Sequence, residues 1–211
     1  MNKNILLVLI LGVFMNISFA NEWKIQDNPY YKHKKSQFEM LKNSENYKVM
    51  MIGDSITDEG EWSELFEIKV QNRGISGDTT SGVIDRLDSL SPSVKTAFIM
   101  IGVNDIMLGK DIGEVYKNYV QILNTFKEKG IKTYIQSTLF IGETRMHNFN
   151  PKVEELNNKL RAYAKENNLI FIDLNPIFAP QKVLKKEFTS DDLHLNGTAY
   201  KLWAQEIKQY F

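Results

Sequence analysis

A serine early in the chain and a histidine near its end are the side chains best suited to nucleophilic chemistry. Gly53-Asp54-Ser55 follows a short apolar run, and a glycine there permits a tight turn that exposes the serine hydroxyl. In Asp191-x-x-His194 an acid stands three residues before a histidine, close enough to hold the imidazole Nδ1–H. A serine hydroxyl needs such a base to attack an ester carbonyl. Ser55 and His194 are therefore candidates for a nucleophile and its base, although Asp-Ser after a strand also commonly begins a helix.

Two further segments offer hydrogen-bond donors. Residues 72–80 read Asn-Arg-Gly-Ile-Ser-Gly-Asp-Thr-Thr, and their two glycines allow the backbone to turn and present N–H groups. Asn104 follows an apolar run, and its amide can donate to a developing oxyanion. Each segment also has an ordinary explanation, because glycine loops, capping residues and turn-forming asparagines are common. Their placement relative to the secondary structure decides between these interpretations.

Short apolar runs alternate along the chain with segments of helical periodicity. Strands are predicted at residues 48–53, 68–72, 96–102, 132–137 and 169–173. Apolar residues recur at helical spacing within 31–41, 83–90, 115–126, 156–164 and 199–210. This alternation favours a mostly parallel sheet with helices on both faces, in which sites form beyond the carboxyl ends of the strands. Ser55, Gly77 and Asn104 all follow predicted strands, so we expect them at that edge.

The composition excludes several classes of protein. Lys and Arg together count 26, as do Asp and Glu, so no overall charge favours nucleic acid or an anionic membrane. Cysteine is absent, which excludes disulfides, thiolate metal sites and a cysteine nucleophile. The 211 residues suit one domain with a sizeable core. Of the three histidines, His33 and His147 lie in polar segments, which leaves His194 as the candidate base.

Residues 1–20 have the pattern of a cleavable signal peptide. Lys3 precedes an apolar run from Ile5 to Phe14, and Ser18-Phe19-Ala20 supplies small residues for cleavage after Ala20. The apolar run is shorter than the roughly 20 residues of a spanning helix. We therefore expect an exported protein, periplasmic or secreted, without a stable membrane anchor. Residues 21–46 would form an N-terminal extension, with a helix packed on a domain of residues 47–211.

Four segments together resemble the signature blocks of the SGNH (GDSL) hydrolase family. They are Gly53-Asp54-Ser55, Gly77, Gly102-x-Asn104 and Asp191-x-x-His194. The resemblance implies a flavodoxin-like three-layer α/β/α sandwich with a five-stranded parallel sheet. It also implies a catalytic triad of Ser55, His194 and Asp191, and an oxyanion hole formed by the N–H groups of Ser55 and Gly77 and the amide of Asn104. Asp192 competes with Asp191 as the orienting acid, and the family pattern favours Asp191.

The longer strings Gly-Asp-Ser-Ile-Thr-Asp and Arg-Gly-Ile-Ser-Gly-Asp-Thr-Thr are most similar to bacterial relatives of platelet-activating-factor acetylhydrolase and carbohydrate O-acetylesterases. This similarity predicts a short-chain, acetyl-directed serine esterase that acts on a carbohydrate or another small hydrophilic alcohol. Such chemistry requires no metal or organic cofactor. The polar loop 141–150 also favours a hydrophilic substrate, and Asp54 is expected to brace its turn.

Other functions remain open at this stage. A lysophospholipase or acyl thioesterase of the same family would need an apolar channel for a long acyl chain. A glycan-binding protein without activity, or a flavodoxin-like nucleotide binder, is compatible with the fold but leaves the candidate triad unexplained. Trp62 is compatible with either an acyl-pocket wall or the core.

Overall fold

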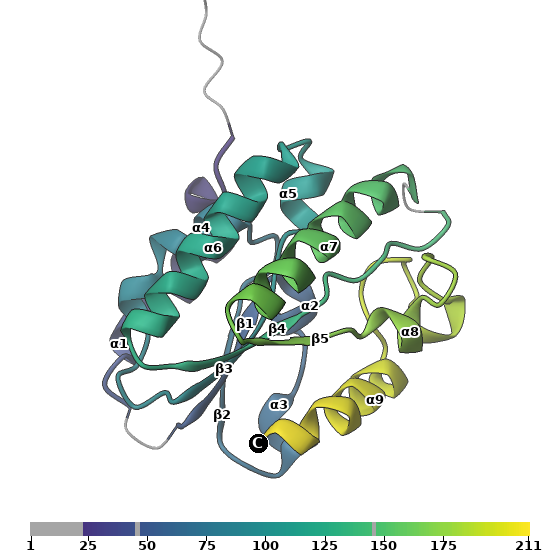
Figure 1. The fold of residues 1–211 in the computed structure, drawn as a ribbon. Helices are drawn as coiled ribbons and strands as arrows, with labels where there is room; N and C mark the ends of the chain where they lie inside the picture. The colour runs from purple at the N-terminus through teal and green to yellow at the C-terminus, as the bar shows by residue number, and fades with distance from the viewer. Residues whose placement is uncertain (1–22, 45–46, 145–146) are drawn as a thin grey trace, which may run out of the picture.

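The computed structural model describes residues 23–44, 47–144 and 147–211. The predicted signal peptide at residues 1–20 lies outside these residues. Five parallel strands form the central sheet in the order β2-β1-β3-β4-β5 (Figure 1). The strands are β1 (Val49–Gly53), β2 (Val70–Gly74), β3 (Thr96–Met100), β4 (Lys132–Gln136) and β5 (Ile170–Ile172). The predicted five-stranded parallel sheet is therefore confirmed, and with it the three-layer α/β/α architecture.

Helices cover both faces of the sheet because its central strands, β1 and β3, bury apolar side chains on both sides. On β1, Met50 and Ile52 face one core and Met51 faces the other, and all three are fully buried. Figure 1 shows α6 and α7 lying together across the first face. That face packs against α4 (Thr80–Asp85), α6 (Ile112–Glu128) and α7 (Asn150–Glu166). The opposite face packs against α2 (Ser55–Asp58), α3 (Trp62–Phe66), α8 (Asn175–Phe178) and α9 (Gly197–Ile207).

The second strand lies two residues later than the apolar pattern predicts. Strand β2 spans Val70–Gly74 rather than residues 68–72, and its Gly74 pairs with Gly53 of β1. A Cβ at Gly74 would overlap the backbone nitrogen of Asp58, so the strand end and α2 approach closely only because this residue is glycine. Ile68, which the prediction placed in the strand, is 44% exposed. The second strand thus continues into the glycine loop and carries it toward α2.

Helix α1 (Pro29–Met40) precedes the sheet in the chain and packs beside α4 and β2. It buries Tyr31 and Phe38 in a small cluster with Ile25 and Ile75. The Tyr31 hydroxyl donates to the carbonyl of Gly82 at 2.7 Å. The ring of Phe38 lies 4.5 Å from the guanidinium carbon of Arg73, within the range of a cation–π contact. These contacts bind the helix to the domain through buried side chains.

Candidate active site

Ser55 is held at the carboxyl edge of the sheet by the junction of β1 and α2. Gly53 ends the strand, and the Asp54 side chain caps the helix by accepting from the N–H of Ile56 at 3.0 Å. Ser55 is the first helical residue, so its N–H belongs to the unpaired amino end of the helix. The expectation that Asp54 braces this turn is confirmed.

His194 lies between Ser55 and Asp191 in a continuous hydrogen-bonded chain. The Nε2 atom of His194 is 2.9 Å from the hydroxyl oxygen of Ser55. The Nδ1 atom is 2.7 Å from Oδ2 of Asp191. Ser55 is separated from His194 by 139 positions in the sequence, so only the fold brings them together. This order of nucleophile, imidazole and carboxylate is the geometry that activates a serine hydroxyl.

Asp191 is held as a charged acceptor by its own loop. Its Oδ1 atom accepts from the N–H groups of Leu193 and His194 at 3.0 and 2.8 Å, while Oδ2 faces the imidazole. Partial burial alone would raise the pKa of Asp191. The hydrogen bonds from the backbone and imidazole of His194 outweigh it and hold the pKa well below its ordinary value. Asp191 therefore remains ionised and contacts the Nδ1 side of the imidazole.

The neighbouring Asp192 turns away from the imidazole. Its backbone is left-handed, with φ of 65°, and its carboxylate accepts from the N–H of Thr144 at 2.9 Å and from the Thr144 hydroxyl. Its carbonyl accepts from the N–H of Gly142 at 2.7 Å. Asp192 thus joins the loop containing His194 to the loop after β4, and Asp191 is the acid that reaches the imidazole.

The predicted oxyanion donors Gly77 and Asn104 follow β2 and β3, the two strands that flank β1. Gly77 has φ of 77°, which an L side chain rarely adopts, and this conformation turns the loop after β2. Asn104 lies in α5 (Val103–Met107), and its side-chain amide donates to the carbonyl of Asp78 at 2.9 Å. That bond fixes the amide and uses only one of its two N–H groups. The second N–H is the group that an oxyanion would need.

Comparison with known proteins identifies the family of the chain. The model of the GDSL-like Lipase/Acylhydrolase family matches residues 51–202. This chain belongs to that family. It is a GDSL-type esterase with the SGNH hydrolase fold, as the four signature segments predict.

Two solved structures illustrate the likeness. A GDSL-like lipase from Bacteroides thetaiotaomicron is 25% identical, with a TM-score of 0.73 over 85% of this chain and 96% of that one. A catalytic mutant of an acetylxylan esterase from Geobacillus stearothermophilus is 18% identical, with a TM-score of 0.65 over 77% and 92% of the two chains. At that identity the second likeness concerns the fold.

A curated relative extends the comparison to a longer protein. The N-acylneuraminate cytidylyltransferase of Streptococcus agalactiae is 28% identical over 185 residues, which make up 82% of this chain. The esterase spans only 42% of that relative's length.

Three carboxyl groups lie buried beneath the loops of the esterase's candidate site. Burial raises the pKa of Asp54 to about 8. Burial likewise raises the pKa values of Asp78 and Asp105 to about 6, although hydrogen bonds oppose it. Asp78 forms an ion pair of 2.8 Å with the fully buried Arg86, and Asp105 accepts from the N–H and hydroxyl of Thr80. These contacts hold the loops that carry Gly77 and Asn104.

A polar cavity of about 380 Å³ lies close to His194. It is lined by Asn28, Tyr30, Asp58, Glu59 and Ser76. The carboxylate of Glu59 lies 3.9 Å from Nε2 of His194, the nitrogen that contacts Ser55. Sequence reasoning did not identify Glu59, yet its position one helical turn after Ser55 was a usable signal. Tyr30 had no such signal, because it lies in a polar segment far from the motifs.

Trp62, which the sequence left as either a pocket wall or a core residue, belongs to the core. It is only 1% exposed and its ring lies 4.7 Å from that of Trp203 in an edge-on contact. Its indole N–H donates to the carbonyl of Thr57 at 2.8 Å. Trp62 is therefore a core residue that packs against α2, and it does not form the wall of an acyl pocket.

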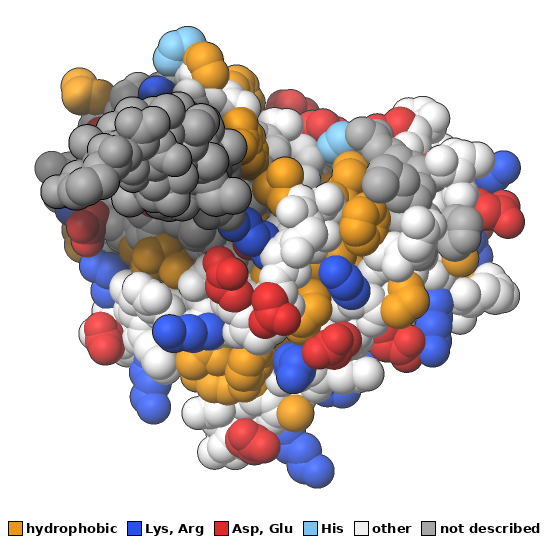
Figure 2. All heavy atoms as spheres, turned by 90° about the horizontal axis from the view of Figure 1, so that it is seen from above, with side chains coloured by type: hydrophobic (Ala, Val, Ile, Leu, Met, Phe, Trp, Pro, Cys, Tyr) orange, Lys and Arg blue, Asp and Glu red, His pale blue; other side chains and the backbone are white. Residues whose placement is uncertain are grey.

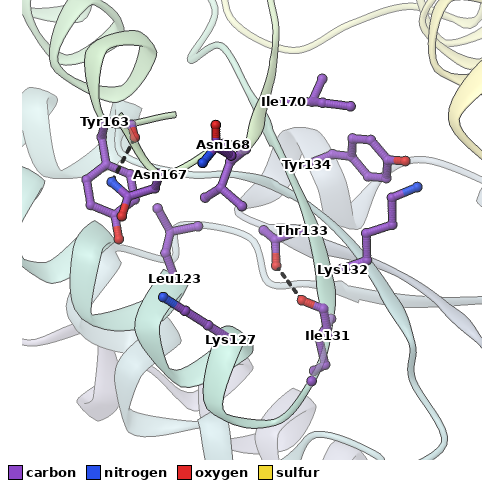
Figure 3. Close-up of a pocket in the computed structure, with 12 residues that line it drawn as sticks. Leu123, Lys127, Ile131, Lys132, Thr133, Tyr134, Tyr163, Asn167, Asn168 and Ile170 are labelled. Atoms are coloured by element: carbon purple, nitrogen blue, oxygen red, sulfur yellow. Dashed lines mark hydrogen bonds between the residues drawn. The ribbon is translucent and has the colours of Figure 1, made fainter. Parts of the chain in front are cut away.

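A second cavity, of about 440 Å³, lies at the opposite edge of the sheet. Figure 3 shows its wall formed by the amino ends of β4 and β5 and by side chains such as Leu123 and Tyr163. Ser55 follows the carboxyl end of β1, whereas this cavity lies at the amino ends of parallel strands, so the cavity is remote from Ser55. In the part of the chain that the structure describes, no group of three or more His, Asp or Glu is arranged to hold a metal ion.

Proposed function

We propose that Ser55, His194 and Asp191 are the catalytic triad of this esterase and that its substrates are short-chain, principally acetyl, esters of a carbohydrate or another small hydrophilic alcohol. The observation that carries the triad is the pair of short contacts at His194, 2.9 Å to Ser55 and 2.7 Å to Asp191. The roles follow from the chemistry of each group.

In this mechanism the Ser55 oxygen attacks the ester carbonyl carbon while its proton passes to Nε2 of His194. The negative charge on the carbonyl oxygen is stabilised by the N–H groups of Ser55 and Gly77 and by the Asn104 amide, each contributing roughly 3 kcal/mol. The carbon–oxygen bond to the alcohol breaks, and His194 returns the proton to the leaving oxygen. Water then repeats the sequence on the acyl-enzyme, releasing the acid and regenerating Ser55.

The polar cavity beside His194 supports a hydrophilic alcohol. Its lining residues are charged or carry hydrogen-bonding groups, whereas a long acyl chain or a lipid requires an apolar channel. One similar structure is an acetylxylan esterase, and the curated relative is named for an N-acylneuraminate. Acetylated derivatives of both kinds of sugar therefore belong in a substrate panel.

The first experiment tests the triad. We expect Ser55→Ala to lower ester hydrolysis by on the order of 10⁴-fold or more, because the other triad members cannot act without the nucleophile. A serine-directed phosphonate should modify Ser55 in the wild type, as measured by peptide mass. Circular dichroism provides the control for folding. Retained turnover in the variant, or modification of another residue, would contradict the assignment.

The second experiment tests the acyl group. We expect kcat/KM for p-nitrophenyl acetate to exceed that for the octanoate. A fitting apolar channel would instead add up to about 0.8 kcal/mol per methylene, so a long-chain enzyme would show a steady rise with chain length. Such a rise would favour the lysophospholipase or thioesterase alternative. Ser55→Ala, included as the blank, separates enzymatic from spontaneous hydrolysis.

Export belongs to the same proposal. The charged, apolar and small-residue regions of residues 1–20 support cleavage after Ala20 and a periplasmic or extracellular location. Within the described residues, the helices lack the length and apolar character needed to cross a membrane. Intact mass of the protein expressed with its leader should correspond to a chain that begins at Asn21. A species that keeps residues 1–20 would contradict this part.

A further inference from the structure

The extension before the matched domain contributes directly to the cavity beside the triad. The family model begins at residue 51, whereas Asn28 and Tyr30 precede it by more than twenty positions. Both nevertheless line the cavity with Asp58, Glu59 and Ser76. Building on the proposed function, we propose that Tyr30 and Glu59 form the subsite for the alcohol part of the ester, and that this alcohol is an uncharged sugar or a similar polyol.

Contacts on both sides of the cavity hold Tyr30 in place. Its hydroxyl donates to Oδ2 of Asp58 at 2.7 Å, and the same oxygen accepts from the N–H of Ser76 at 3.1 Å. Asp58 is in α2, which begins at Ser55, and Ser76 directly precedes Gly77. The Asp58 carboxylate therefore links the N-terminal extension to α2, which begins at Ser55, and to the loop that contains Gly77.

Helix α1 is anchored firmly enough to present a binding residue. Lys34 forms an ion pair of 2.7 Å with Asp58, whose side chain is only 8% exposed. Tyr31 and Phe38 are buried on the same helix, and the Asn28 side chain caps it by accepting from the N–H of Tyr30 at 2.8 Å. The backbone of Tyr30 is thus fixed at the first turn of the helix, while its side chain remains partly open to solvent.

The position of Glu59 indicates which part of the ester enters the cavity. His194 must deliver a proton from Nε2 to the leaving oxygen, so the alcohol has to lie beside that nitrogen. Glu59 is 3.9 Å from Nε2 and lines the cavity. The alcohol part therefore extends toward Glu59 and Tyr30, and the acyl group lies on the other side of the carbonyl.

The chemistry of the lining suits hydroxyl groups. A carboxylate accepts strong hydrogen bonds from sugar hydroxyls, and a partly exposed tyrosine offers an apolar ring face together with a polar tip. Tyr30 is 44% exposed, and its hydrogen bond to Asp58 together with its burial raises the pKa of its hydroxyl to about 12. The hydroxyl stays protonated and can still accept a bond from a ligand.

The charges disfavour an anionic alcohol. Lys34 offsets the charge of Asp58, but the Glu59 carboxylate lies 3.9 Å from Nε2 of His194, and Asp191 adds a second negative charge on the Nδ1 side of the ring. A carboxylate or phosphate on the alcohol would be repelled there. The subsite therefore selects a neutral sugar rather than an acidic sugar or a phospholipid head group.

The test compares three substrates with the full mature protein. They are p-nitrophenyl acetate, a mono-O-acetylated methyl xyloside, and the methyl glucuronoside that carries the acetyl group at the same position. The last two differ by a carboxylate. We expect the wild type to favour the xyloside ester over the glucuronoside ester by about tenfold in kcat/KM.

Two variants of Tyr30 test its role. Relative to p-nitrophenyl acetate, Tyr30→Phe should lower kcat/KM for the xyloside ester about fivefold, and Tyr30→Ala about thirtyfold, mainly through KM. If Tyr30 acted only by positioning Asp58, the two variants would have equal effects, because both lack the hydroxyl. Tyr116→Phe is the matched control, since Tyr116 lies on α6, outside the cavity lining.

Glu59→Gln tests the charge. It should reduce the preference for the neutral sugar to about threefold or less, whereas Glu64→Gln on α3 should leave the preference unchanged. An unchanged preference in Glu59→Gln, or an unchanged substrate ratio in Tyr30→Ala, would overturn the subsite while Ser55 remains the nucleophile. Absence of hydrolysis of all three acetyl esters by the folded wild type would instead overturn the proposed function itself.

Discussion

Two groups of aspartates border the same edge of the sheet, and the structure shifts their pKa values in opposite directions. Asp191 lies in a surface loop with its side chain 37% exposed, and hydrogen bonds keep its pKa low. Asp54, Asp78 and Asp105 lie beneath the loops, at most 3% exposed, and burial raises their pKa values. The difference arises from how much water each group loses and how many donors replace it.

In the proposed mechanism Asp191 assists catalysis, whereas the three buried aspartates hold loops in place. A carboxylate that stabilises an imidazolium must remain charged at every pH at which the enzyme works. Buried acids that hold loops need not be charged, and Asp54 at neutral pH is the clearest case because its pKa is about 8. Replacing members of each group should therefore change different measurements.

The largest effect is expected at Asp191. Asp191→Asn keeps the shape of the side chain but removes the charge that fixes the Nδ1–H tautomer, so kcat should fall about 10⁴-fold. Stability should change little, since the side chain is partly exposed. The measurement is steady-state hydrolysis of p-nitrophenyl acetate together with urea unfolding.

Asp192→Asn is the matched control, because its carboxylate contacts Thr144 and not the imidazole. Its kcat should fall less than about tenfold. Equal losses of kcat in Asp191→Asn and Asp192→Asn would contradict the proposal that Asp191, and not Asp192, orients His194.

The next effect concerns the buried ion pair. Asp78→Asn leaves the Arg86 guanidinium fully buried without its charged partner, which should lower the free energy of unfolding by about 3–5 kcal/mol. Thermal unfolding should then occur on the order of 10 °C lower. Asp85→Asn removes a partner of Lys35 at the surface and should cost only about 1 kcal/mol. Similar losses of unfolding free energy in Asp78→Asn and Asp85→Asn would show that burial does not determine how much each ion pair contributes.

Sequence reasoning selected three residues that the structure brings into contact, because they lie in short segments with fixed local roles. Gly53-Asp54-Ser55 ends a strand, and Asp191 lies near enough to His194 in the chain to reach its imidazole without help from the fold. Apolar runs likewise predicted the central strands β1 and β3, since strands buried on both faces are largely apolar. The shift of β2 could not be predicted, because it depends on the close approach of Gly74 to Asp58.

The cavity was beyond sequence reasoning for a different reason. Tyr30 meets Asp58 across 28 positions, and the helix that carries it has only two buried residues, Tyr31 and Phe38. Such a helix gives little periodicity from which to infer its docking face. Glu59 was more accessible to prediction, because a residue four places after a helical nucleophile lies on the same face.

The smallest expected effect is on the pH dependence of the unfolding free energy, and it is tested by replacing Asp54. The pKa of Asp54 in the folded state, about 8, lies above its ordinary value of 3.8, so the folded state binds the proton more tightly. Its contribution to stability is fully present below pH 4 and is lost as the pH rises through 8. Between pH 5.5 and 7.5 the wild type should therefore lose about 1 kcal/mol of unfolding free energy per pH unit through this group. Asp54→Asn, which can still accept from the N–H of Ile56, should show a correspondingly flatter profile in urea unfolding. Parallel profiles for the two proteins would mean that Asp54 is ionised in the fold, and the contrast with Asp191 would then rest on Asp78 and Asp105 alone.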